Sequence, residues 1–178
     1  RVGVFDHPER KRKDRKLRAP VIACALDNDT SITVNLAGWH LKPGIISYKE
    51  NYSTVPSSVA QAQAKTAIAN SFATWDALVS AVTLSEDTPA SATRARLDGQ
   101  NAVLWKRQSL STLAVAYVWY YTNTHEVAES DLVFNSRHRW SYTPYTATCS
   151  SLNSYDVQNI GTHEVGHWMG LDDMYGSS

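Results

Sequence analysis

The stretch HEVGHWMGLDD, His163 to Asp173, has two histidines four residues apart, a glutamate directly after the first, and a glycine three residues after the second. Residues four apart on a helix lie one above the other, so the imidazoles of His163 and His167 can reach a single point. Zinc binds such nitrogens at about 2.0–2.1 Å, and a catalytic zinc uses three protein ligands and keeps one position open for water. The stretch therefore predicts a metal site that still needs a third ligand.

The third ligand has to come from beyond the helix. Gly170 can adopt a positive φ at the helix end, which would reverse the chain and bring Asp173 back toward the histidines. Asp172 is adjacent and chemically equivalent, so it is the alternative ligand. Glu164 is turned by about 100° around the helix from His163, which keeps it off the metal but near a metal-bound water. Its predicted role is that of general base.

A non-catalytic interpretation is a hydrogen-bonded histidine pair on a half-buried helix face. With average residue frequencies, the two histidines, the glutamate, the glycine and the acid at these offsets arise by chance in roughly one in ten thousand chains of this size. The metal site is therefore favoured. The other four histidines lack this spacing and are interpreted as structural: His7, His40, His125 and His138.

Apolar periodicity predicts an α/β chain. A helix is expected over residues 57–78, where Ala60, Ala64, Ile68, Phe72 and Trp75 form one apolar stripe. A second helix is expected to start near Ser154, its N-cap, and to stop at Gly170. Alternating or β-branched runs predict five strands. These runs are Gly44–Tyr52, Ala81–Ser85, Asn101–Arg107, Leu113–Thr122 and Val127–Phe134, and Asn135–Asn153 is expected to be a loop.

Charge divides the chain of 178 residues unevenly. Eight of the seventeen basic residues lie in the first twenty positions, and the rest of the chain has nine basic and fourteen acidic residues, a formal net charge of −5. We expect residues 1–36 to be a basic arm, linker or pro-segment remnant, and residues 37–178 to be one catalytic domain. An acidic domain repels phosphate, so no nucleic-acid partner is predicted. No membrane span is predicted either.

Two cysteines, Cys24 and Cys149, leave several pairings open. They allow one internal disulfide, two free thiols, or bonds to partners outside this chain. Pairing depends on the separation of the Cα atoms, so the sequence does not choose between these states.

The residues His163, Glu164, His167, Gly170 and Asp173 resemble the extended motif of the metzincin zinc peptidases, HExxHxxGxx followed by His or Asp. An aspartate in the last position is similar to the small bacterial proteases of the snapalysin type. Upstream, WHLKPGIISY, AYVWYY and ESDLVFN resemble the first, fourth and fifth strands of the matrixin branch. The resemblance covers roughly residues 39–173.

The resemblance implies a twisted five-stranded mixed sheet with a backing helix and an active-site helix, in a secreted or periplasmic, monomeric zinc endopeptidase. Its substrate would be an extended peptide antiparallel to an edge strand, Leu113 to Tyr121 here. Zinc-bound water would be the nucleophile and Glu164 the general base. The alternative is a catalytically silent or latent zinc-binding domain of the same family.

Three features depart from the family pattern. The family has a methionine-containing turn well beyond the third ligand, whereas Met174 follows Asp173 directly, so we expect the chain to be truncated before that turn. The cysteine that blocks matrixin zymogens has no counterpart in its usual motif; Cys24, in IACALDN, is expected in a disulfide, with zinc ligation as the alternative. Nothing matches the loop that holds the second zinc and the calcium of animal matrixins, so neither is predicted.

Overall fold

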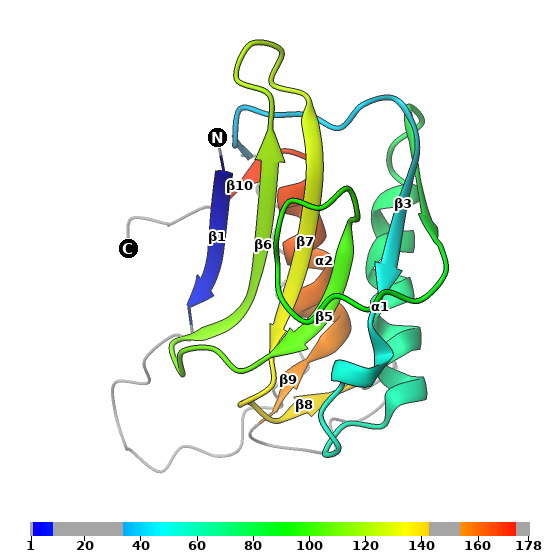
Figure 1. The fold of residues 1–178 in the computed structure, drawn as a ribbon, viewed down its shortest axis with the longest axis vertical. Helices are drawn as coiled ribbons and strands as arrows, with labels where there is room; N and C mark the ends of the chain where they lie inside the picture. The colour runs from blue at the N-terminus through cyan, green and yellow to red at the C-terminus, as the bar shows by residue number, and fades with distance from the viewer. Residues whose placement is uncertain (1, 9–33, 143–153, 174–178) are drawn as a thin grey trace.

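The computed structural model describes residues 2–8, 34–142 and 154–173. Its centre is a six-stranded mixed sheet with two helices on one face (Figure 1). The elements are β1 (Val2–Pro8), β2 (Asn35–Leu36), β3 (Gly44–Glu50), the 3₁₀ turn η1 (Tyr52–Thr54), α1 (Gln61–Asp76), β4 (Val82–Glu86), β5 (Ala102–Lys106), β6 (Thr112–Tyr120), β7 (Val127–Asn135), β8 (Trp140–Ser141), β9 (Tyr155–Asp156), α2 (Val157–Trp168) and β10 (Leu171–Asp172).

The strand order in the main sheet is β1-β6-β7-β5-β3-β4. Strands β4, β3, β5 and β7 are parallel to one another, and β6 runs antiparallel to β7. These five strands are the ones that the sequence predicts, and their bounds agree to within two residues at each end. The mixed α/β class and the five strands are therefore confirmed.

The sixth strand, β1, comes from the segment expected to be an arm or linker, where no element is predicted. It pairs antiparallel with the outer edge of β6. In this structure β6 is therefore not an edge strand, which corrects the expectation for Leu113 to Tyr121. The basic run Arg10–Arg18, both cysteines and Met174 lie outside the described residues, so their predictions stay open.

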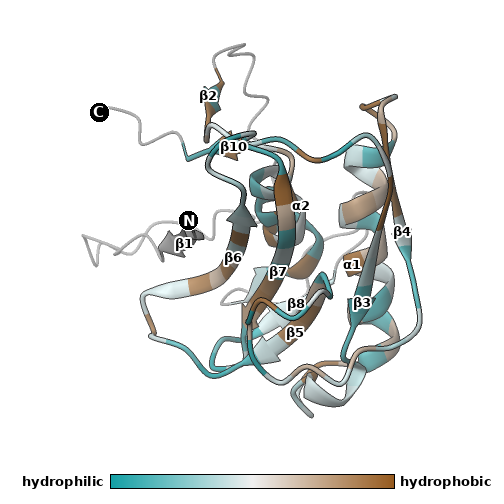
Figure 2. Cartoon of the chain, turned by 45° about the horizontal axis from the view of Figure 1, so that its top comes forward, coloured by the Kyte–Doolittle hydropathy of each residue, from teal (hydrophilic) through white to brown (hydrophobic). Residues whose placement is uncertain are grey.

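Helix α1 buries the stripe that its periodicity indicates, with Ala64, Ile68 and Phe72 at most 1% exposed. It is shorter than expected, because Ala60 is the N-cap and lies exposed. Hydrophilic and hydrophobic stretches alternate along both helices (Figure 2). None of the helices in the described part of the chain is long and apolar enough to cross a membrane.

The two helices approach closely where Gly161 of α2 faces Ser71 of α1. A Cβ at Gly161 would lie 2.5 Å from Ser71 Oγ. That hydroxyl donates to the carbonyl of Gln158 at 3.0 Å, and Trp75 Nε1 donates to the carbonyl of Thr162 at 2.7 Å. These side-chain bonds fix α2, which carries the histidines, against α1.

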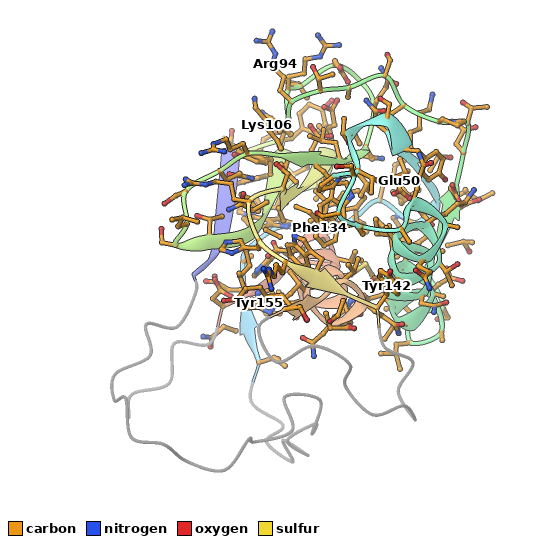
Figure 3. The ribbon with its side chains drawn as sticks, turned by 90° about the horizontal axis from the view of Figure 1, so that it is seen from below. Glu50, Arg94, Lys106, Phe134, Tyr142 and Tyr155 are labelled. Carbon is orange, nitrogen blue, oxygen red and sulfur yellow. The ribbon has the colours of Figure 1, made fainter. Side chains whose placement is uncertain are left out.

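The other face of the sheet is covered by the segment between β4 and β5. Arg94 in that segment and Lys106 of β5 lie on the opposite side of the sheet from Phe134 and Tyr155 (Figure 3). Two buried carboxylates of β7 hold the segment: Glu129 accepts from the backbone N–H of Asp98 at 2.9 Å, and Asp131 from that of Arg96 at 2.9 Å. The donors are backbone N–H groups, so any residue type except proline at these positions could make the bonds.

The buried carboxyl group of Glu50, at the end of β3, should make the free energy of unfolding depend on pH. Burial, and then the nearby Glu86, raise the pKa of Glu50 from the ordinary 4.5 to about 8. The Glu50 side chain lies on the α1 side of the sheet (Figure 3). Tyr48, two residues earlier on the same face of β3, stacks on Phe72 of α1. Because the folded protein holds this proton more tightly than the unfolded chain, stability falls as the pH rises from about 4.5 to about 8.

We expect Glu50→Gln to remove this contribution. At pH 9 its free energy of unfolding should exceed that of the parent by on the order of a few kcal/mol, while near pH 4.5 the two should be similar. Urea unfolding at both pH values measures the difference. An equal loss of stability between the two pH values in both proteins would rule out Glu50 as the cause.

Candidate metal centre

Helix α2 begins at Val157, six residues before His163, and the motif occupies its end and the turn that follows. Its N-cap is Asp156, whose Oδ1 accepts from the backbone N–H of Asn159 at 2.8 Å. The prediction of Ser154 as the cap is wrong by two residues, because the helix begins at Val157 and its cap is the residue directly before it. Val157, Val165 and Trp168 are fully buried, so the apolar face is fixed in the core.

The chain reverses directly after the helix, at Gly170, whose φ is +93°. The Gly170 N–H donates to the carbonyl of His167 at 3.1 Å, and the Gly170 carbonyl accepts from the N–H of Ala37 at 2.8 Å. Leu171 and Asp172, which form β10, then pair with Leu36 and Asn35 of β2. The turn predicted from Gly170 is confirmed, and the short ladder fixes the direction of the chain toward Asp173.

His163, His167 and Asp173 come together at the end of α2 and could hold a metal ion. The two histidine Nε2 atoms lie 3.1 Å apart. Asp173 Oδ1 is 3.1 Å from Nε2 of His163 and 3.6 Å from Nε2 of His167. Ligands at about 2.0–2.1 Å from a tetrahedral zinc lie about 3.3–3.4 Å from one another. The three separations, 3.1–3.6 Å, lie close to this edge length, so a single metal ion could contact all three atoms.

A hydrogen bond to the backbone determines which ring nitrogen of His167 carries the proton. Its Nδ1 lies 2.9 Å from the carbonyl oxygen of Leu171, and a carbonyl only accepts, so Nδ1 carries the proton. Nε2 then presents its lone pair to the other two ligands, as a neutral metal-binding histidine does. The His167 ring is almost fully buried, whereas the side chain of His163 is 33% exposed. The site is thus anchored on one side and reachable from solvent on the other.

The two aspartates have different surroundings. The side chain of Asp173 is 10% exposed and faces the histidines, whereas Asp172 is an exposed residue. Asp172 Oδ1 accepts from the backbone N–H of Asp173 at 2.8 Å. The structure therefore brings Asp173 to the histidines and leaves Asp172 to support the turn.

This difference predicts separate effects on metal affinity. We expect Asp173→Ala to weaken zinc binding by at least about 100-fold, above the loss of about 10–100-fold that is typical when only a supporting partner of a ligand is removed. Asp172→Ala should stay within about 10-fold of the parent. Competition with a chromophoric chelator measures both. If Asp172→Ala weakened zinc binding more than Asp173→Ala, Asp172 would be the third ligand instead.

Glu164 is completely buried, between the two histidines in sequence. The histidines interpreted as structural contact backbone carbonyls instead: Nε2 of His138 lies 2.9 Å from the carbonyl of Thr112, and His40 contacts the carbonyls of Leu41 and Thr124. The side chain of His7 lies outside the described part of the chain. Within the described ranges, only the cluster at the end of α2 groups three residues of metal-binding type.

Sequence reasoning missed the residues that support the site from the N-terminal side. Trp39 Nε1 donates to the carbonyl of His167 at 2.9 Å, and the Trp39 ring stacks on Tyr120 of β6 at a centroid distance of 5.2 Å. Asn35 Nδ2 donates to the carbonyl of Asp173 at 3.2 Å. Each contact joins residues more than 80 positions apart, and no local pattern signals it.

Comparison with known proteins adds no identification. No family model matches the sequence, and no curated protein is significantly similar to it. The geometry of the site is therefore the basis for assigning a function.

Proposed function

We propose that the chain is a zinc-dependent endopeptidase that hydrolyses extended polypeptides. One observation carries this proposal: three metal-binding atoms, on His163, His167 and Asp173, have the mutual spacing of a zinc tetrahedron, with a buried glutamate between the histidines. Two imidazoles and one carboxylate are a ligand set that zinc takes in hydrolytic sites. The fourth position would remain open toward the exposed side of His163.

Each residue then has a distinct task. His163, His167 and Asp173 would hold zinc, which when bound supplies an activated water and polarises the substrate carbonyl. Glu164 would take the proton from the attacking water and pass it to the leaving amine. His167 would keep its orientation through the bond from Nδ1 to the Leu171 carbonyl.

The arrangement of the sheet also supports the proposal. The strands that resemble the first, fourth and fifth strands of the matrixin branch are β3, β6 and β7, and β6 is antiparallel beside β7. The substrate would pair with the outer edge of β6 in place of β1, which occupies that edge in this structure, and α2 packs against one face of β6. We further propose secretion, because the metzincin resemblance implies an extracellular or periplasmic enzyme.

The test is metal-dependent cleavage of an unstructured peptide mixture. We expect about one zinc per chain, loss of cleavage after removal of the metal with 1,10-phenanthroline, and recovery on adding zinc. Mass spectrometry identifies the cut bonds and plasma emission spectrometry the metal content. If the protein binds one zinc and cleaves nothing in the mixture, it is a silent or latent zinc-binding domain. If it binds no zinc, neither the peptidase nor the silent domain is correct.

A further inference from the structure

The outer edge of β6 is occupied by the chain itself. Strand β1 pairs with it antiparallel, from Val2 opposite Trp119 to Asp6 opposite Val115 in regular register, and ends with Pro8 opposite Thr112 after an irregularity. In Figure 1, β1 continues the sheet beyond β6, and α2 runs behind β6 and β7. The backbone groups on that edge of β6 are therefore already used by a segment of this protein.

That edge is linked to the metal-binding residues. Near the end of β6, where Val2 pairs, Tyr120 stacks on Trp39, and Trp39 Nε1 bonds to the carbonyl of His167. A segment along β6 thus runs beside the end of α2 that carries the site. A bound peptide and β1 need the same N–H and C=O groups of β6, so both cannot pair there at once.

We propose that β1 is an internal competitor of the substrate, held on the edge of β6 in the orientation that the substrate would take. This inference rests on the proposed function. Pairing through backbone bonds is tolerant of sequence, so β1 can occupy the edge without a special motif. Because β1 belongs to the same chain, its effective concentration is on the order of millimolar, enough to exclude weakly binding peptides. Displacement of β1 would open the site.

Proline substitutions in β1 test this proposal in the full chain. In an antiparallel pair, the N–H groups of alternate residues point toward the partner strand. Within the regular register, one of the double variants Val2→Pro/Val4→Pro and Gly3→Pro/Phe5→Pro removes two N–H donors to β6, and the other removes two donors that point away. The two variants are therefore matched controls for each other.

The first measurement is binding, and it needs no turnover. A fluorescent peptide with the sequence of residues 1–8, RVGVFDHP, is titrated into each variant in a Glu164→Gln background, and anisotropy is followed. We expect one double variant to bind the peptide at least about 10-fold more tightly than the Glu164→Gln parent, and the other to stay within about 2-fold of it. Equal binding by all three proteins, or binding by none, would overturn the proposal.

The second measurement is the initial rate of peptide cleavage with Glu164 intact and zinc added. The double variant that binds the peptide should cleave at least about 10-fold faster than the parent, and its matched control should not. An increase in binding with unchanged cleavage would show that β1 does not lie in the path of the substrate. If binding increases and no protein cleaves at all, the competition for the edge stands and the proposed peptidase activity is what fails.

Discussion

Glu164→Gln is expected to reduce kcat/KM for peptide cleavage by about 10²–10⁴-fold, the usual contribution of a general base, while zinc stays near one per chain. Glutamine has nearly the same shape and cannot accept the proton. The shape matters because Glu164 is completely buried, and a smaller side chain would leave a cavity in the packing beside α2. Metal should be retained because the three atoms with zinc-like spacing belong to other residues.

The matched control for this change is Glu126→Gln, which alters a half-buried acid between β6 and β7, outside the metal cluster. We expect its kcat/KM to stay within about 2-fold of the parent, since substitutions away from a site act weakly. Unchanged turnover in Glu164→Gln would remove Glu164 from the mechanism. Loss of zinc from that variant would make Glu164 part of the metal site instead.

Local patterns were sufficient to predict the parts of the fold with a buried face. The stripe of α1 recurs at the helical period, and the strands β3 to β7 are alternating or continuous β-branched and apolar runs; both patterns are present in the sequence itself. The candidate site is predictable for the same reason. The pairing of His163 with His167 follows from helix geometry, and the approach of Asp173 follows from the turn that a glycine at position 170 permits.

The remaining features depend on contacts that no local pattern records. Strand β1 pairs with a partner more than a hundred residues away through backbone groups, and it precedes a basic run that indicates an arm. Strand β2 and β10 are two residues long, below the length at which alternation can be seen. Trp39 contacts the end of α2 across 128 positions of sequence. Sequence reasoning therefore predicts the ligands and misses much of what orients them.

Gly170 is the residue on which that orientation depends most, and Gly170→Ala is expected to disrupt both the fold and the metal site. A residue with a side chain pays roughly 1–2 kcal/mol for a left-handed conformation such as φ +93°. In addition, a Cβ at this position would lie 2.3 Å from the carbonyl oxygen of Trp39, which is backbone and cannot rotate away. We expect the total loss of stability to exceed about 3 kcal/mol.

Gly170→Ala should also lower the zinc affinity by at least about 10-fold. Relief of the clash between the new Cβ and the Trp39 carbonyl oxygen would move β10, and Asp173 would move with it. Gly99→Ala is the matched control: its φ is +80°, but nothing lies within 4 Å of the new Cβ. It should cost only the conformational term of about 1–2 kcal/mol and leave zinc affinity unchanged. Urea unfolding of the metal-free proteins and chelator competition separate the two effects. Equal losses of stability at both glycines, with zinc affinity intact, would mean that the turn yields around Trp39 without displacing Asp173.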